Sequence, residues 1–361
     1  MTNSWGSGTP LTLDFDCLRS ITEGVNEVRV WRDAILDCER VGKRIDLRGM
    51  GTLDVINEPA MLNRIDHQNV VPVVAAARVD GFPPNMDVVE IVTPYFRRGS
   101  ISDALLAGET FTPRQAVRIT QQVLRGLGAL HEQYRLCHRD MKSGNVLLPD
   151  VGETAMVADL GLAAVFDDSG TVASGDNPTL YSPPELGSGE RLGRPSDIWP
   201  VGLILRELLG GPFPYAAYSK ADVIQRLQRD HRVLRKRDRE LPVWAGASLR
   251  RIYRKATHRF PAQRFQSASE MDEALARATV IDWVEVQCGL AWTAPFQHKP
   301  GRTIRVEATP RRRGGYRLTV LADRGAGPRR VPNVSDADVP DLGGPQARDF
   351  FDQASRIASA R

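Results

Sequence analysis

The chain has 361 residues, a formal net charge of +4, 42% hydrophobic residues and 25% charged residues. This composition is typical of a folded, soluble protein and excludes a disordered chain. No apolar run reaches the roughly 20 residues that span a bilayer, and the first residues lack the basic-then-apolar pattern of an export signal. The four cysteines are scattered, so we expect a cytoplasmic protein with reduced thiols and no membrane partner.

The length predicts two or three compact units. Residues 1–14 are predicted to be a flexible tail, and residues 15–97 a strand-rich lobe, because apolar and polar residues alternate along its short segments. The predicted elements of this lobe are strands at 27–31, 40–47, 69–79 and 87–96 and a helix at 52–65.

Residues 98–279 have the patterns of a helical lobe. An amphipathic helix is predicted at 113–133, with a proline near its start. Residues 196–210 are apolar on almost every side, which indicates a buried helix. Residues 220–238 predict a basic amphipathic helix.

Residues 280–361 change back to strand patterns and predict a small appended α+β domain. Residues 303–308 and 316–322 alternate on either side of a glycine-containing turn, which predicts a hairpin. Residues 346–360 predict a closing helix.

One segment of the helical lobe holds an unusual set of polar residues. "LCHRDMKSGNVLL" (136–148) places a histidine, an arginine, an aspartate, a lysine and an asparagine between apolar ends. Polar groups held against a core need partners. Four further motifs follow in order: "VADLGLA" (157–163), "YSPPE" (181–185), "SDIWPVG" (196–202) and "PAQRF" (261–265).

As an ordered set, these motifs resemble the eukaryotic-type Ser/Thr protein kinase family over residues 15 to about 279. The resemblance implies a two-lobed protein kinase-like fold with a strand-rich N-lobe and a helical C-lobe. It also implies ATP bound between the lobes, Mg²⁺ on its phosphates, and transfer of the γ-phosphate to a hydroxyl group of a protein substrate.

The resemblance assigns roles in the C-lobe. Asp140 would accept the proton of the attacking hydroxyl, and Lys142 would neutralise charge on the transferred phosphate. Asn145 and Asp159 would hold Mg²⁺. Three structural residues complete the set: Asp197 would brace the catalytic loop, and Glu185 would pair with Arg264.

The resemblance also assigns roles in the N-lobe. Lys43 would bind the α- and β-phosphates and pair with Glu58. The remaining residues expected around the nucleotide are Gly24 and Val30 over the phosphates and base, the gatekeeper Thr93, and the hinge residues Pro94 and Phe96.

The glycine-rich loop departs from the family pattern. "ITEGVNEVRV" (21–30) offers Gly24 alone, and the carboxylate of Glu27 would repel the phosphates unless it turns outward. This leaves open a pseudokinase that serves as a regulatory interaction module with weak nucleotide binding. A small-molecule phosphotransferase is a second alternative, against which Lys142, the "SPPE" segment and the Asp197 helix all count.

Two further features of the sequence suggest regulation or partners. Arg139 precedes the catalytic aspartate, so a phosphate on Thr171 or Ser174 could order the activation segment, and we expect autophosphorylation there. The appended domain could bind a substrate, a regulator or a second copy of the chain. The basic stretches at 228–239 and 311–317 are better explained as solvated surface than as a nucleic-acid site.

Overall fold

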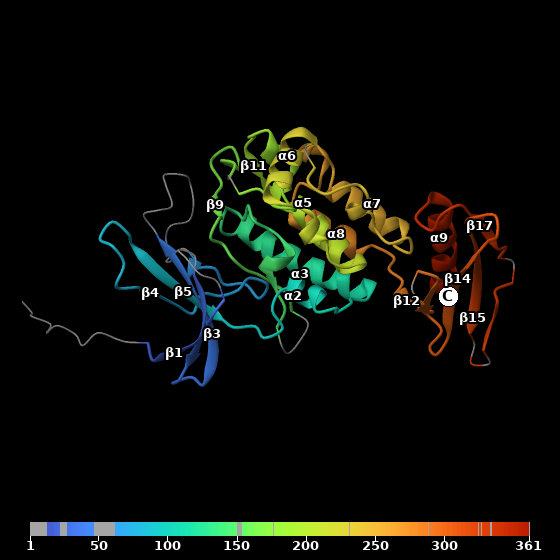
Figure 1. The fold of residues 1–361 in the computed structure, drawn as a ribbon, viewed down its shortest axis with the longest axis horizontal. Helices are drawn as coiled ribbons and strands as arrows, with labels where there is room; N and C mark the ends of the chain where they lie inside the picture. Colours follow the sequence, from blue (N-terminus) through green and yellow to red (C-terminus); the bar gives the residue numbers. More distant parts are fainter. Residues whose placement is uncertain are drawn as a thin grey trace, which may run out of the picture.

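The computed structural model describes residues 13–21, 27–46, 62–149, 154–175, 177–230, 232–287, 289–323, 325, 327–332 and 334–360. Figure 1 shows a strand-rich region, a helical lobe and a C-terminal sheet with its own helix, following one another along the long axis. This is the predicted two-lobed fold with an appended α+β domain. No helix in the described ranges is long and apolar enough to cross a membrane.

The N-terminal region is an antiparallel sheet in the order β1-β2-β3-β5-β4. Its strands are β1 (Phe15–Ser20), β2 (Val28–Asp33), β3 (Cys38–Asp46), β4 (Ala75–Arg78) and β5 (Val88–Pro94). Each of the four predicted strands has a counterpart, although the one predicted at 69–79 is a strand only over Ala75–Arg78. The predicted helix at 52–65 lies mostly outside the described residues, which resume at Leu62.

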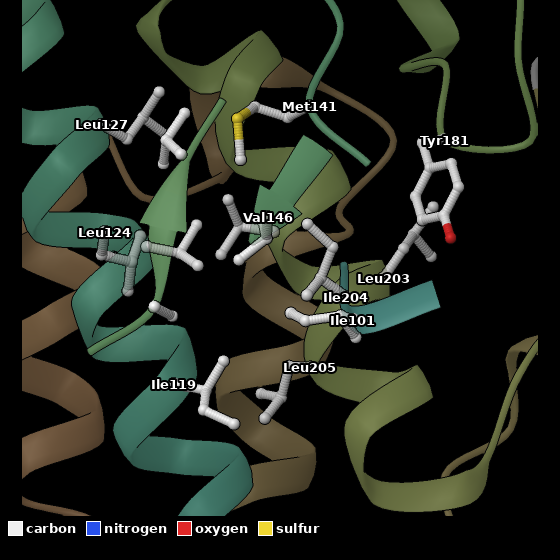
Figure 2. Close-up of a cluster of buried hydrophobic side chains, with 14 of the residues drawn as sticks. Ile101, Ile119, Leu124, Leu127, Met141, Val146, Tyr181, Leu203, Ile204 and Leu205 are labelled. Carbon is white, nitrogen blue, oxygen red and sulfur yellow. The ribbon is translucent and has the colours of Figure 1, made fainter. Parts of the chain in front are cut away.

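The helical lobe is built around α3 (Pro113–Glu132) and α5 (Arg194–Gly210), both predicted from the sequence. Figure 2 shows side chains of α3 and α5 meeting in its core, with Met141 and Val146 beside them. Met141 is 2% exposed and Val146 is fully buried, so one apolar residue within the polar loop and one directly after it fix the loop to this core. The other helices are α2 (Ile101–Leu106), α4 (Pro184–Gly187), α6 (Lys220–Asp230), α7 (Ala247–Ala256) and α8 (Ala268–Ala276).

The predicted helix at 220–238 is too long. Helix α6 ends at Asp230, and the chain regains helical shape only in the short 3₁₀ turn Arg237–Arg239. The reason is burial: Val233 and Leu234 are each 2% exposed, and reaching the core requires the chain to leave the helix. The carbonyl of Val233 accepts a hydrogen bond of 2.5 Å from Arg226 Nε, which fixes this turn.

The C-terminal region is an antiparallel sheet with one helix packed on it. Its strands follow the order β12-β13-β14-β15-β16, with β17 also paired to β15. The predicted hairpin is present as β14 (Thr303–Pro310) and β15 (Tyr316–Asp323), and the closing helix as α9 (Pro345–Ser359). The other strands are β12 (Val284–Gln287), β13 (Ala291–Pro295), β16 (Pro328–Arg330) and β17 (Ala337–Val339).

This sheet and α9 enclose a core of their own. Phe351 of α9 is 1% exposed and meets the edges of Trp283 and Trp292, with ring centroids 5.4 and 5.1 Å away. The alternating residues of β14 and β15, Ile304, Val306, Leu318 and Val320 among them, close the same cluster.

Candidate active site

The polar loop is held by one buried carboxylate. Asp197, in the first turn of α5, accepts hydrogen bonds from the backbone amides of His138 and Arg139 at 2.8 and 2.9 Å. It also contacts His131 Nε2 of α3 at 2.8 Å. Arg139 has φ +65°, a left-handed conformation that a non-glycine residue adopts only when held. The predicted brace is therefore confirmed.

Asp140 lies at the centre of this loop with one oxygen occupied. Its Oδ2 accepts hydrogen bonds from Lys142 Nζ at 2.7 Å and from Asn145 Nδ2 at 3.1 Å. Asn145 Nδ2 also donates to the Asp140 carbonyl at 2.8 Å. No hydrogen bond to Asp140 Oδ1 is found among the described residues.

Asp159 is joined to the opposite lobe through Lys43 of β3. The Lys43 Nζ to Asp159 Oδ1 distance is 2.5 Å, and each side chain is about one third exposed (31% and 33%). Burial alone would raise the pKa of Asp159, but the charge and hydrogen bond of Lys43 hold that pKa below its ordinary value. Asp159 also has left-handed backbone, with φ +59°, which turns the segment after it.

A cavity of about 270 Å³ lies between the sheet and the helical lobe. Four predicted residues line it: Lys43, Thr93, Asn145 and Asp159. The wall also includes apolar residues that we did not single out from the sequence, among them Val28, Val41, Ile91 and Leu147. The sequence could have indicated Val41 and Leu147. Val41 lies two residues before Lys43 and Leu147 two residues after Asn145, and residues two apart in a strand share a face.

Val30 does not line this cavity. It pairs with Val41 across the sheet and shares its face, but it is 1% exposed and belongs to the packed interior. The cavity wall on β2 is made by Val28 instead. The prediction therefore chose the correct face of the sheet, but a residue two positions too far along β2.

Pro94 and Phe96 lie just past the cavity wall, on the connection between the lobes. Pro94 ends β5 opposite Arg40, and the Phe96 carbonyl accepts a hydrogen bond from Gly99. The Phe96 amide donates to no acceptor within the described part of the chain. Gly24 and Glu58 fall outside the described residues.

Glu27 turns away from the cavity. Its carboxylate lies 2.9 Å from Arg29 Nε and 2.9 Å from Arg44 Nη1. Val28 and Lys43 line the cavity, so Arg29 and Arg44 occupy the other face of the sheet. The hydrogen bond from Arg29 lowers the pKa of Glu27. The repulsion considered for this residue is therefore avoided.

The start of the activation segment is fastened to the catalytic loop by Arg139. Its Nε donates to the Leu162 carbonyl at 2.5 Å and its Nη1 to the Ala173 carbonyl at 3.2 Å. The Thr171 hydroxyl is bonded to a different arginine, because it accepts a hydrogen bond of 2.7 Å from Arg191 Nε. Leu160, in the position that the family gives to phenylalanine, packs against the main core as predicted.

The end of the segment is held by the predicted ion pair. Arg264 Nη1 and Nη2 donate to the two carboxylate oxygens of Glu185 at 2.8 and 2.6 Å. Both side chains are almost completely buried, at 1% and 4% exposure. Such a bidentate pair fixes orientation as well as distance.

The family comparison gives one match, the protein kinase domain, over residues 37–275. This match covers more than half of the chain. The chain belongs to the protein kinase family. The matched residues include β3, the catalytic loop, Asp159 and the Glu185–Arg264 pair.

Relatives of this kinase include serine/threonine kinases from bacteria and plants. It is 26% identical over 268 residues to serine/threonine-protein kinase PrkC of Bacillus subtilis (strain 168), covering 72% of this chain and 39% of that protein. It is 36% identical over 129 residues to mitogen-activated protein kinase kinase SIPKK of Nicotiana tabacum, 36% of each chain. It is 28% identical over 230 residues to serine/threonine-protein kinase 12 of Arabidopsis thaliana, covering 62% of this chain and 48% of that protein.

These relatives confirm the predicted eukaryotic-type Ser/Thr protein kinase family. The kinase spans 36% to 48% of the length of these three relatives.

Proposed function

We propose that this chain is an active Ser/Thr protein kinase that transfers the γ-phosphate of ATP to a protein hydroxyl. The proposal rests on one observation: Lys43, Asn145 and Asp159 belong to separate segments and line the same cavity. The side chain of Asn145 also donates a hydrogen bond to the carboxylate of Asp140. These are the residue types that phosphoryl transfer requires for positioning and charge stabilisation.

The donor set of the cavity fits Mg²⁺. Asn145 uses its amide nitrogen towards Asp140, which leaves its amide oxygen for a metal ion, and Asp159 lines the same cavity. Hard oxygen ligands suit Mg²⁺, which proteins commonly hold with one or two carboxylates plus phosphates of the substrate. Consistent with that mode, the described residues contain no cluster of three or more His, Cys, Asp or Glu side chains. When bound, Mg²⁺ would neutralise charge on the ATP phosphates.

The remaining roles follow from the same contacts. Asp140 Oδ1 would accept the proton of the attacking hydroxyl. Lys142, which donates a hydrogen bond to Oδ2, would keep the carboxylate oriented and place its ammonium group near the transferred phosphate. Lys43 would bind ATP phosphates. Thr93, Pro94 and Phe96 would border the adenine, and the Phe96 amide, which has no acceptor among the described residues, would donate to it. Gly24 and Glu58 remain predictions, whereas Val30 is not proposed as a nucleotide contact because it does not line the cavity.

We propose autophosphorylation at Ser174 in preference to Thr171. The Ala173 carbonyl lies 3.2 Å from Arg139 Nη1, and Ser174 follows Ala173 directly in the chain, so a phosphate there would be able to reach that guanidinium. The Thr171 hydroxyl is engaged by Arg191. Phosphopeptide mapping of active enzyme is expected to find Ser174 modified, and a fully active enzyme with an unmodified segment would contradict this.

The pseudokinase alternative is less favoured. It depended on the poor glycine loop and on Glu27, whose carboxylate faces away from the cavity. A cytoplasmic location, protein substrates and a separate C-terminal unit at 280–361 are proposed with the kinase activity. The core shared by the C-terminal sheet and α9 supports that division.

Transfer of labelled γ-phosphate from Mg-ATP to a general protein substrate tests the function. Asp140→Asn and Lys43→Met are each expected to lower the rate about 10²- to 10⁴-fold. The matched controls are Asp80→Asn and Lys220→Met, both at exposed positions, and they should keep wild-type rates. Ordinary activity in Asp140→Asn would show that the proton acceptor is misassigned.

A further inference from the structure

A second cavity, of about 330 Å³, lies where the helical lobe meets α9. None of its lining residues lines the catalytic cavity. We call it the basic cleft, defined by Lys236, Arg239, Arg250, Arg254, Arg348 and Glu240. Figure 1 shows α7 and α9 on the two sides of this junction.

The cleft draws its cations from three elements. Lys236 and Arg239 belong to the turn around Arg237–Arg239, and Arg250 and Arg254 lie one turn apart on α7. Arg348 comes from α9. An ion pair between Arg250 and Asp352 of α9 joins the two sides, so the relative positions of these cations are fixed by contact between the lobe and the C-terminal region.

The charges in the cleft do not balance. Five cationic side chains and one acidic side chain, Glu240, line the cleft. A second acid, Asp352, forms an ion pair with Arg250. Five minus two leaves an excess of three positive charges in a concave site. Such a site concentrates anions, because the fields of its walls add.

The hydrogen-bond donors of the cleft are largely unused. Within the described ranges, Arg239 and Arg254 each donate through Nε alone, to the carbonyls of Leu234 and Arg250 at 3.1 and 3.3 Å. Across the described part of the chain, Lys236 Nζ and the Arg348 guanidinium have no hydrogen-bond acceptor or ion-pair partner. Three guanidinium groups with free Nη atoms therefore face one small space.

We propose that the basic cleft binds a phosphate monoester on a protein segment, a phosphoserine or phosphothreonine. Arginine forks match phosphate oxygens in bidentate geometry, and the concave volume suits one compact dianionic group. A duplex nucleic acid would instead need an open surface along its backbone. The choice of a phosphorylated segment over other monoesters rests on the proposed kinase function, since that activity produces such segments.

The binding of a short Gly-Ala peptide with one central phosphoserine tests the site, measured by fluorescence anisotropy on the full chain without ATP. The phosphopeptide is expected to bind at least about tenfold more tightly than its unphosphorylated form, as one or two charge-assisted hydrogen bonds would give. Arg348→Glu and Lys236→Glu should each remove about tenfold or more. Arg251→Glu makes the same charge change at an exposed α7 position outside the cleft and should alter binding less than about twofold.

Inorganic phosphate and a labelled RNA duplex complete the design. Competition by millimolar phosphate supports the site, while tighter binding of the duplex, unaffected by phosphate, would overturn it. Equal affinity for both peptides, or equal loss in Arg251→Glu, would also overturn it. Because no ATP is present, this result is separate from kinase activity: an inactive chain that selects the phosphopeptide would refute the proposed function and keep the cleft.

Discussion

Removing the guanidinium of Arg264 is expected to destabilise the helical lobe severely. Arg264 makes two hydrogen bonds to Glu185 and donates to the carbonyls of His258, Arg259 and Pro195 at 2.8, 3.1 and 3.0 Å. Its guanidinium carbon also lies 5.0 Å from the centre of the Trp199 ring. Arg264→Met would keep much of the side-chain volume and remove all five polar contacts.

The size of the effect follows from what remains. Glu185 is 4% exposed, so its carboxylate would stay buried without a counterion. Leaving one partner of a buried pair uncompensated costs about 3–5 kcal/mol. The three carbonyls that lose a donor place Arg264→Met at the upper end of that range. The free energy of unfolding is measured by urea titration, followed by far-ultraviolet circular dichroism and tryptophan fluorescence.

A double variant separates the cost of the unpaired Glu185 charge from the cost of lost packing around Arg264. Glu185→Leu with Arg264→Met removes the stranded charge, so it should be more stable than the sum of the single changes predicts, by about 1–3 kcal/mol. The control is Arg277→Met, which breaks an exposed i,i+4 pair with Glu273 worth only about 0.3–0.5 kcal/mol. A loss below about 1 kcal/mol in Arg264→Met would refute the reasoning, since burial would then carry no electrostatic cost.

Three further predictions concern other parts of the chain. Gly42→Ala would place a Cβ against the buried carboxylate of Glu90 and cost about 1–3 kcal/mol, which thermal unfolding would measure; no change would mean that the carboxylate moves freely. Burial raises the pKa of the Cys137 thiol well above its usual value, so iodoacetamide at pH 8 should alkylate exposed Cys17 rapidly and Cys137 only after unfolding. Although burial alone would raise it, hydrogen bonds hold the pKa of Asp197 below its ordinary value. The ionised Asp197 carboxylate contributes its full stabilisation above about pH 4, and this contribution is lost as the pH falls through its pKa in the folded protein. In Asp197→Asn, the midpoint of urea unfolding should therefore depend less on pH in the acid range.

The sequence predicted the chemical positions better than the extent of the elements. Asp197 and the Glu185–Arg264 pair could be predicted because each role demands one residue type at one place in an ordered set. The end of α6 could not, since helical periodicity continues past Asp230 and only the burial of Val233 shows why the chain turns. Periodicity records which residues are apolar, and tertiary packing decides where they must go.

The same limit explains the error at Val30. Alternation along β2 gives the correct face of the sheet, but how far along that face the cavity extends depends on what the helical lobe places opposite it. Glu27 shows the converse. Its outward direction follows from alternation once Lys43 is known to face the cavity, and two arginines on the other face then stabilise it.

Two lysines of the site lie beside its two central carboxylates. The chain has only six lysines among its 48 basic residues, yet two of them pair with the two central carboxylates, Lys43 with Asp159 and Lys142 with Asp140. Each ammonium group offsets the charge of the carboxylate that it contacts. An ammonium group is compact and turns on a flexible stem, so each lysine would be able to contact a phosphate from its place beside the carboxylate. A planar guanidinium in either place would hold its carboxylate in a bidentate fork, so lysine, although rare in this chain, suits these two positions better than arginine.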